Sequence, residues 1–122
     1  MKTKEVIQLT VPEIDVFDLQ KREWETLPAD QNLPSQRAGC TAVKYKNYLV
    51  VIGGESVAQK DSHHDVEAFD TKKGIWIKWP GLVTGRHDTG ALTYKKSVYI
   101  AAGSANRGGG PDQQTIEVLS KP

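Results

Sequence analysis

The chain has 122 residues, a length that suits one domain. Its composition is 38% hydrophobic and 25% charged, which is ordinary for a globular protein and excludes collagen-like structure and wholesale disorder. Sixteen lysines and arginines against fifteen aspartates and glutamates give a formal charge of +1, so we predict no binding to nucleic acid or to an anionic membrane through bulk charge. The longest apolar run, residues 48–52, is far too short to span a bilayer.

The start of the chain and its cysteine content say little about the cellular compartment. Residues 1–5 lack the apolar core of a signal peptide, so no leader is predicted. The single cysteine, Cys40, allows no internal disulfide and no cysteine-based zinc cluster. A chain without disulfides suits either side of a membrane, so the localisation stays open. No residue pattern indicates a cofactor.

Short strands are predicted along the whole chain. Eleven glycines and six prolines divide the sequence at short intervals. The apolar runs between them are rich in Val, Ile, Tyr and Thr, which suit a pleated, half-buried surface. In chain order, clear examples are residues 48–52, 97–101 and 115–119, and residues 6–10 form an extra run that is either a tenth strand or a remnant of a preceding one. Because no long segment has the apolar period of a helix, we predict an all-β fold with tight turns.

The strands repeat with a period near 50 residues. Residues 37–54 align without gaps on 86–103, and residues 16–28 align on 68–80. The identical pairs are Arg37/Arg86, Ala42/Ala91, Tyr45/Tyr94, Lys46/Lys95, Gly54/Gly103, Phe17/Phe69, Asp18/Asp70, Lys21/Lys73, Trp24/Trp76 and Pro28/Pro80. The segment Val66-Glu67-Ala68-Phe69 also recurs as Ile116-Glu117-Val118-Leu119. A period of this length with four strand-like runs is typical of a β-propeller blade.

The repeated residues have separate physical roles. The pair Gly53-Gly54 follows an apolar strand and permits both a positive φ and close approach of another backbone. The carboxylate of Asp70 is placed to close the turn that follows it. A tryptophan six residues after each repeated aspartate offers a large apolar surface. We therefore expect Trp24 and Trp76 to be buried between neighbouring blades.

This order of residues resembles the kelch repeat. The complete copy runs from Arg37 through Gly53-Gly54 and Phe69-Asp70 to Trp76 and Pro80. A partial copy with Phe17-Asp18, Trp24 and Pro28 precedes it, and another partial copy follows it over residues 86–119. The last copy departs from the pattern, because Ala102-Gly103 and Leu119-Ser120 replace Gly-Gly and aromatic-Asp. The last copy also lacks the strand that carries the tryptophan.

The resemblance implies blades of four antiparallel strands, labelled A to D from the central channel to the rim, usually with five to seven blades in a ring. On this interpretation residues 1–122 form a single partial propeller. A first blade ends over residues 12–36, a complete blade spans 37–80, and a third blade begins over 86–120. An incomplete ring exposes apolar faces and strand edges. We therefore expect either a piece of a longer propeller or self-association through the open blade edges.

Candidate ligand-binding residues lie near the predicted loops. The resemblance implies that Arg37 and Arg86 lie near the channel mouth, where several kelch domains use arginines to bind carboxylates of an acidic partner. The alternative is that each arginine bonds a loop carbonyl or an acid of its own blade. His87 is a further candidate at the channel mouth. Asn106 and Arg107 are candidates in a glycine-rich segment, which is either an anion-binding nest or a plain connection between strands.

No metal site or catalytic residue is predicted. The segment His63-His64-Asp65 has no third ligand at zinc spacing and is interpreted as a solvated loop. The resemblance favours a non-catalytic binding or scaffold module whose propeller loops contact a protein or an acidic ligand. The alternative is a fragment of a kelch-like propeller enzyme that acts on carbohydrates, of the copper-radical oxidase or sialic-acid mutarotase type. A paired Tyr and His ligand set for copper is not apparent in the sequence.

Overall fold

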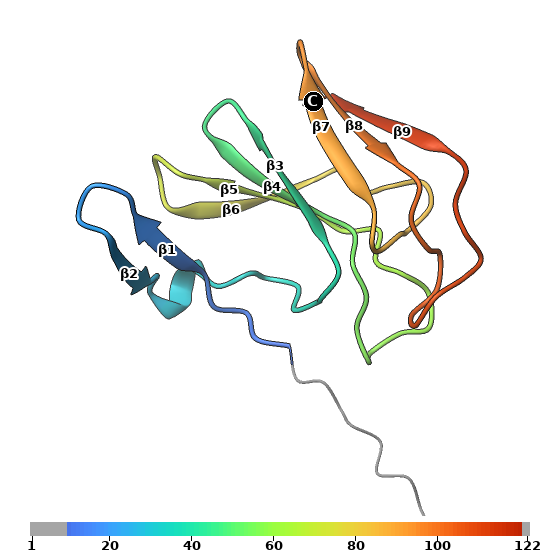
Figure 1. The fold of residues 1–122 in the computed structure, drawn as a ribbon, viewed down its shortest axis with the longest axis horizontal. Helices are drawn as coiled ribbons and strands as arrows, with labels where there is room; N and C mark the ends of the chain where they lie inside the picture. Colours follow the sequence, from blue (N-terminus) through green and yellow to red (C-terminus); the bar gives the residue numbers. More distant parts are fainter. Residues whose placement is uncertain (1–9, 121–122) are drawn as a thin grey trace, which may run out of the picture.

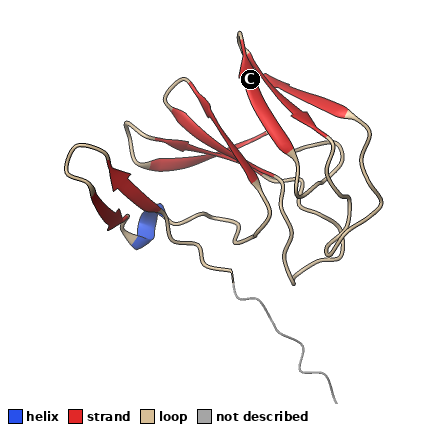
Figure 2. Cartoon of the chain, in the orientation of Figure 1, coloured by secondary structure: helices blue, strands red, loops and turns tan. Residues whose placement is uncertain are grey.

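Nine short strands form three antiparallel sheets within residues 10–120, the part of the chain that the computed structural model describes (Figure 1). The strands are β1 (Asp15–Asp18), β2 (Glu23–Thr26), β3 (Thr41–Tyr45), β4 (Tyr48–Ile52), β5 (Val66–Asp70), β6 (Ile75–Trp79), β7 (Gly90–Tyr94), β8 (Ser97–Ala101) and β9 (Ile116–Ser120). A single 3-10 turn, η1 (Ala29–Gln31), follows β2, and loops make up most of the remainder (Figure 2). The predicted all-β class is confirmed.

The sheets are consecutive along the chain and each is a simple meander. Their strand orders are β1-β2, β3-β4-β5-β6 and β7-β8-β9, and we call them the first, central and third blades. Figure 1 shows them side by side like a fan, with the central blade between the other two. The blades are antiparallel sheets of two to four strands, as expected for part of a propeller.

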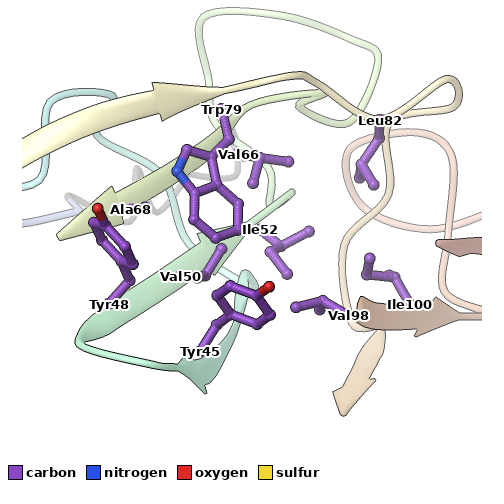
Figure 3. Close-up of a cluster of buried hydrophobic side chains, with 10 residues drawn as sticks. All are labelled: Tyr45, Tyr48, Val50, Ile52, Val66, Ala68, Trp79, Leu82, Val98 and Ile100. Atoms are coloured by element: carbon purple, nitrogen blue, oxygen red, sulfur yellow. The ribbon is translucent and has the colours of Figure 1, made fainter. Parts of the chain in front are cut away.

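The hydrophobic core lies between the central and third blades (Figure 3). Alternate side chains of β4 and β5 point to one face of the central sheet, where they meet alternate side chains of β8. Six residues of this interface are fully buried: Val50, Ile52, Val66, Ala68, Val98 and Ile100. Tyr45, Tyr48, Trp79 and Leu82 complete the cluster. The core therefore depends on the stacking of two blades, since one sheet alone cannot cover its own face.

Trp79 is the tryptophan that is buried between blades. Its side chain is 4% exposed, and its ring lies 5.6 Å from the ring centroids of both Tyr45 and Tyr48 (Figure 3). Trp76 lies three positions earlier on the same strand and therefore points to the opposite face. Trp79 does not occupy the tryptophan position of the repeat. It pairs across the sheet with Val66, which pairs with Ile52, so its side chain lies on the core face of the sheet.

The expected burial of the two repeat tryptophans is wrong for Trp24, which is 71% exposed. Trp76 is half-buried, and its indole N–H donates to the carbonyl oxygen of Gln31 at 2.8 Å. The two residues are nevertheless equivalent in local geometry. The ring pairs Phe17–Trp24 and Phe69–Trp76 have centroid separations of 5.1 and 5.2 Å and interplanar angles of 52° and 49°. The two tryptophans differ in what packs over them. No described segment packs over the outer face of the first blade, where Trp24 lies.

The repeated aspartates close equivalent turns, as predicted for Asp70. Asp18 Oδ1 accepts the backbone N–H groups two and three positions later, each at 2.8 Å. Asp70 Oδ1 accepts the N–H groups of Lys72 and Lys73 at 2.9 and 3.1 Å and the side-chain amide of Asn47 at 2.9 Å. Burial raises the pKa of Asp70, but these hydrogen bonds outweigh burial and the pKa lies below its ordinary value. The carboxylate is therefore ionised at neutral pH.

The glycine pair after β4 adopts the backbone conformations that were expected of it. Gly53 and Gly54 have φ values of +65° and +115°. The N–H of Gly54 donates to the carbonyl oxygen of Arg86 at 2.8 Å, and a Cβ on Gly53 would overlap that oxygen. In the third blade Ala102 replaces the first glycine and still adopts a φ of +60°. A left-handed alanine is strained by roughly 1 to 2 kcal/mol.

We predict that Trp79→Ala lowers the free energy of unfolding by roughly 3–5 kcal/mol, because it opens a cavity in the core. The matched variant Trp24→Ala removes the same side chain from an exposed position and should change stability by less than about 0.5 kcal/mol. Urea denaturation followed by circular dichroism measures both values. Equal losses in the two variants would contradict the proposed location of the core.

We also predict that Gly53→Ala costs about 2 kcal/mol or more, since a left-handed φ and a steric overlap with the Arg86 carbonyl act together. Gly108→Ala is the control, because its φ is +80° and its added Cβ meets nothing within 4 Å. This control should lose only the conformational cost of about 1 kcal/mol. Thermal and urea unfolding of both variants would show whether the close approach matters beyond φ.

Candidate functional site

Three loops lie together at one end of the central and third blades (Figure 1). They are residues 53–65 after β4, residues 80–89 between the blades and residues 102–115 after β8. Backbone hydrogen bonds of 2.7–3.0 Å join them: Gly54 to Arg86, Ser62 to Ala105, Arg107 to Lys60, and His87 to and from Ser104. We call these residues the loop layer. Its internal bonds make the three segments one connected surface.

Arg37 lies beneath the loop layer, with a side chain that is 0% exposed. Its guanidinium forms an ion pair with Glu67 of β5, with an Nη1–Oε2 distance of 2.7 Å. It also donates to the carbonyl oxygens of Ser35, Val51 and Gly53. Glu67 in turn accepts the hydroxyl of Ser35 at 2.7 Å. The arginine thus connects the segment that leads into the central blade with the end of β4 and the start of β5.

Arg86 repeats this arrangement in the third blade. Its side chain is 0% exposed, and its Nη2 lies 2.7 Å from Oε2 of Glu117 in β9. Further bonds reach the carbonyl oxygens of Thr84, Ala102 and Thr115 and the hydroxyl of Thr115. Glu117 also accepts the backbone N–H of Thr84 at 3.1 Å. Both arginines therefore adopt the alternative in which each pairs with an acid of its own blade.

Sequence reasoning missed the two glutamates as partners of the arginines. The signal was present, because Glu67 and Glu117 occupy the same position of the repeated segment. A buried guanidinium needs a carboxylate partner, and the two buried pairs have identical distances of 2.7 Å. Binding of an external acid by Arg37 and Arg86 stays a prediction.

His87 is buried at the junction of the three loops, with 3% exposure. Its Nδ1 lies 3.0 Å from the hydroxyl of Ser62. Its Nε2 lies 3.6 Å from a carboxylate oxygen of Glu55 and 3.7 Å from one of Asp88. The ring therefore faces two acids while its other nitrogen is bonded inside the layer. This places the candidate His87 under the loop surface.

Asn106 and Arg107 lie within the loop after β8 and are held by the neighbouring loop. Asn106 forms an isolated β-bridge with Asp61. Arg107 is exposed, and its Nη1 donates to the carbonyl oxygen of Val57 at 3.0 Å. The glycine-rich segment also bonds Glu55 through the N–H of Gly108 at 2.7 Å. The segment thus connects β8 to β9 within the third blade and is bonded to the loop after β4 of the central blade. Its use as an anion nest stays a prediction.

His63 differs from the solvated loop that was expected for His63-His64-Asp65, whereas His64 is exposed and Asp65 is partly exposed. His63 is 8% exposed, with Nδ1 at 2.7 Å from Oδ2 of Asp65 and Nε2 at 2.8 Å from Oγ of Ser56. Burial raises the pKa of Asp65, but the hydrogen bond with His63 and the charges of Arg37 and Lys78 outweigh it, so this pKa is below its ordinary value. Across residues 10–120, no three His, Cys, Asp or Glu side chains form a group that could hold a metal ion.

We predict that Glu117→Gln lowers the free energy of unfolding by about 3 kcal/mol or more, because it leaves the buried guanidinium of Arg86 without a counter-charge. Glu67→Gln should cost a similar amount at the equivalent pair. Glu25→Gln, on the exposed strand β2, is the control and should cost less than about 0.5 kcal/mol. Urea unfolding measures the three variants. Losses below about 1 kcal/mol at both buried pairs would show that the pairs do not stabilise the fold.

Comparison with known proteins agrees with this geometry. Residues 36–82 match the family model described as the kelch motif, a span that contains the central blade and its Arg37–Glu67 pair. No curated protein sequence matches the chain significantly. Among the described residues, no helix is both long and apolar enough to cross a membrane. The match shows a kelch motif over residues 36–82, and the blades on either side of it are antiparallel sheets of the propeller type.

Proposed function

We propose that the chain is a protein-binding scaffold that uses one open blade face and the loop layer to contact partners. Kelch repeats typically mediate protein interaction, and the match over residues 36–82 supports this class of function. The observation that carries the proposal is the apolar face of the third blade. On that face we propose another propeller blade as the occupant, supplied by a second copy of the chain.

The open face of the third blade consists of the alternate side chains of β7, β8 and β9 that point away from the core. Leu92, Tyr94, Ile116 and Val118 are 57, 58, 66 and 51% exposed. With Gly90, Ala91, Tyr99 and Ala101, the first three line an apolar groove of about 610 Å³. Contiguous exposed apolar surface of this kind marks an interaction site.

The repeat supports another blade as the occupant of this face. The equivalents of Tyr94, Ile116 and Val118 in the central blade are Tyr45, Val66 and Ala68. Those three residues are 4, 0 and 0% exposed, because the third blade covers them. The central and third blades therefore present equivalent apolar faces. The face of the central blade is buried, and the face of the third blade is open. Another blade has the shape and apolarity that complement it.

The first blade offers a second open surface for such a contact. Phe17 and Trp24 are 39 and 71% exposed, and they are the equivalents of Phe69 and Trp76 on the opposite face of the central blade. Opposite faces at the two ends of the fan favour head-to-tail association, in which the third blade of one copy meets the first blade of the next. Such a heterologous contact builds rings or filaments.

In the loop layer, Arg107 supports the proposal of an acidic partner. A guanidinium has five N–H donors in a fork that matches a carboxylate. Arg107 is exposed, whereas the side chains of Arg37 and Arg86 are 0% exposed. We propose Arg107 as the first point of contact for a carboxylate of a partner protein. Arg37 and Arg86 are the further candidates for binding the same acidic partner.

Sedimentation velocity across the micromolar range tests the proposed association. We expect the wild-type chain to associate as its concentration rises, and Val118→Lys to weaken this association about tenfold or more because it places a charge in the open face. Val83→Lys is the control, because Val83 is 86% exposed in the loop between the central and third blades and lies outside the strands of both open faces. A wild-type chain that stays monomeric, or equal effects of the two variants, would contradict the proposed interface.

A further inference from the structure

In the loop after β4, a serine, a histidine and an aspartate form a chain of two hydrogen bonds, with the histidine in the middle. Oγ of Ser56 lies 2.8 Å from Nε2 of His63, and Nδ1 of the same ring lies 2.7 Å from Oδ2 of Asp65. This is the order of contacts through which a base activates a serine hydroxyl and an acid orients the base. We infer that Ser56 is a nucleophilic serine, activated by His63 and Asp65, that accepts acyl groups from small esters.

The proton positions follow from the contacts. An ionised carboxylate only accepts hydrogen bonds, so Asp65 requires the proton of neutral His63 to be on Nδ1. Nε2 then carries the lone pair and accepts the O–H of Ser56. The lowered pKa of Asp65 keeps its carboxylate charged at neutral pH. Because His63 is 8% exposed and bonded at both nitrogens, its ring is held in the orientation that the proton transfer needs.

Ser56 is also reachable from solvent. It is partly exposed and directly precedes the turn at residues 57–58. A second serine–histidine pair in the same layer provides an internal contrast. Ser62 is 0% exposed, its hydroxyl donates to the carbonyl oxygen of Ser104 at 2.9 Å, and it meets His87 through Nδ1 at 3.0 Å. Of these two serines, Ser56 alone combines access with a histidine whose other nitrogen bonds a carboxylate at 2.7 Å.

The reaction that this geometry supports is acyl transfer from an ester. Oγ of Ser56 attacks the carbonyl carbon and forms a C–O bond while its proton moves to Nε2 of His63. The tetrahedral intermediate then collapses, the ester C–O bond breaks, and the departing alkoxide takes the proton from Nε2 to leave as an alcohol. Water attacks the acyl-serine by the same route in reverse, with His63 as base, and releases a carboxylic acid and free Ser56. The assignment does not rest on the proposed scaffold function.

Labelling of the purified full chain with a fluorophosphonate probe tests this inference. The probe phosphonylates nucleophilic serines with loss of fluoride, and peptide mass spectrometry locates the adduct. We expect the adduct on Ser56 and its complete loss in Ser56→Ala. His63→Gln and Asp65→Asn should each slow labelling about a hundredfold or more, since general-base assistance is worth this much. Hydrolysis of p-nitrophenyl acetate should fall in the same three variants.

Ser62→Ala is the matched control and should label like the wild type. Circular dichroism of every variant shows whether it folds, and Asp65→Asn, which keeps the shape of the side chain, decides the matter if His63→Gln does not fold. The inference is overturned if the wild type gives no adduct on Ser56. It is also overturned if the adduct spreads evenly over several serines, or if Asp65→Asn labels at the wild-type rate.

Discussion

A buried charge pair in each of the two larger blades organises the end of the molecule where the loops meet. A guanidinium that is taken out of water must be paired and fully hydrogen-bonded, or it costs several kcal/mol. Arg37 and Arg86 meet this requirement with a glutamate from the third strand and with carbonyl oxygens from the end of the second strand. These bonds fix where the strands end and where the long loops begin. The loops that carry His63, His87 and the glycine-rich segment all begin next to these bonded strand ends.

The second organising element is the apolar contact between blades. Within the described chain this contact is made once in full, between the central and third blades, and its two halves appear again as open faces at the ends of the fan. The polar bonds at one end of the blades and the apolar stacking along their faces therefore have different structural roles. The charge pairs set the local shape of a blade, whereas the stacking determines how many blades are needed for a stable structure.

Much of the fold could be predicted from the sequence because the repeat carries it. Local patterns indicated the strands, the left-handed glycines and the aspartate turns, since each depends on residues close together in the chain. The exposure of Trp24 could not be predicted this way, because it depends on which blade lies next to it. The partner of Arg37 is 30 positions away, and the contact of Ser56 with His63 depends on the path of one loop. Trp79 was within reach of the sequence, since its strand parity alone places it on the face opposite Trp76.

The bonds of the loop layer join positions that are far apart in the chain. Arg107 reaches Val57 across 50 residues, and Gly108 reaches Glu55 across 53. Each hairpin forms from neighbouring residues, but these links require two blades to be present, so loop closure delays them. We expect the strands of a blade to assemble first and the layer to close last. The two blades should then unfold as one cooperative unit, and a molecule that binds the layer would raise the melting temperature of both together.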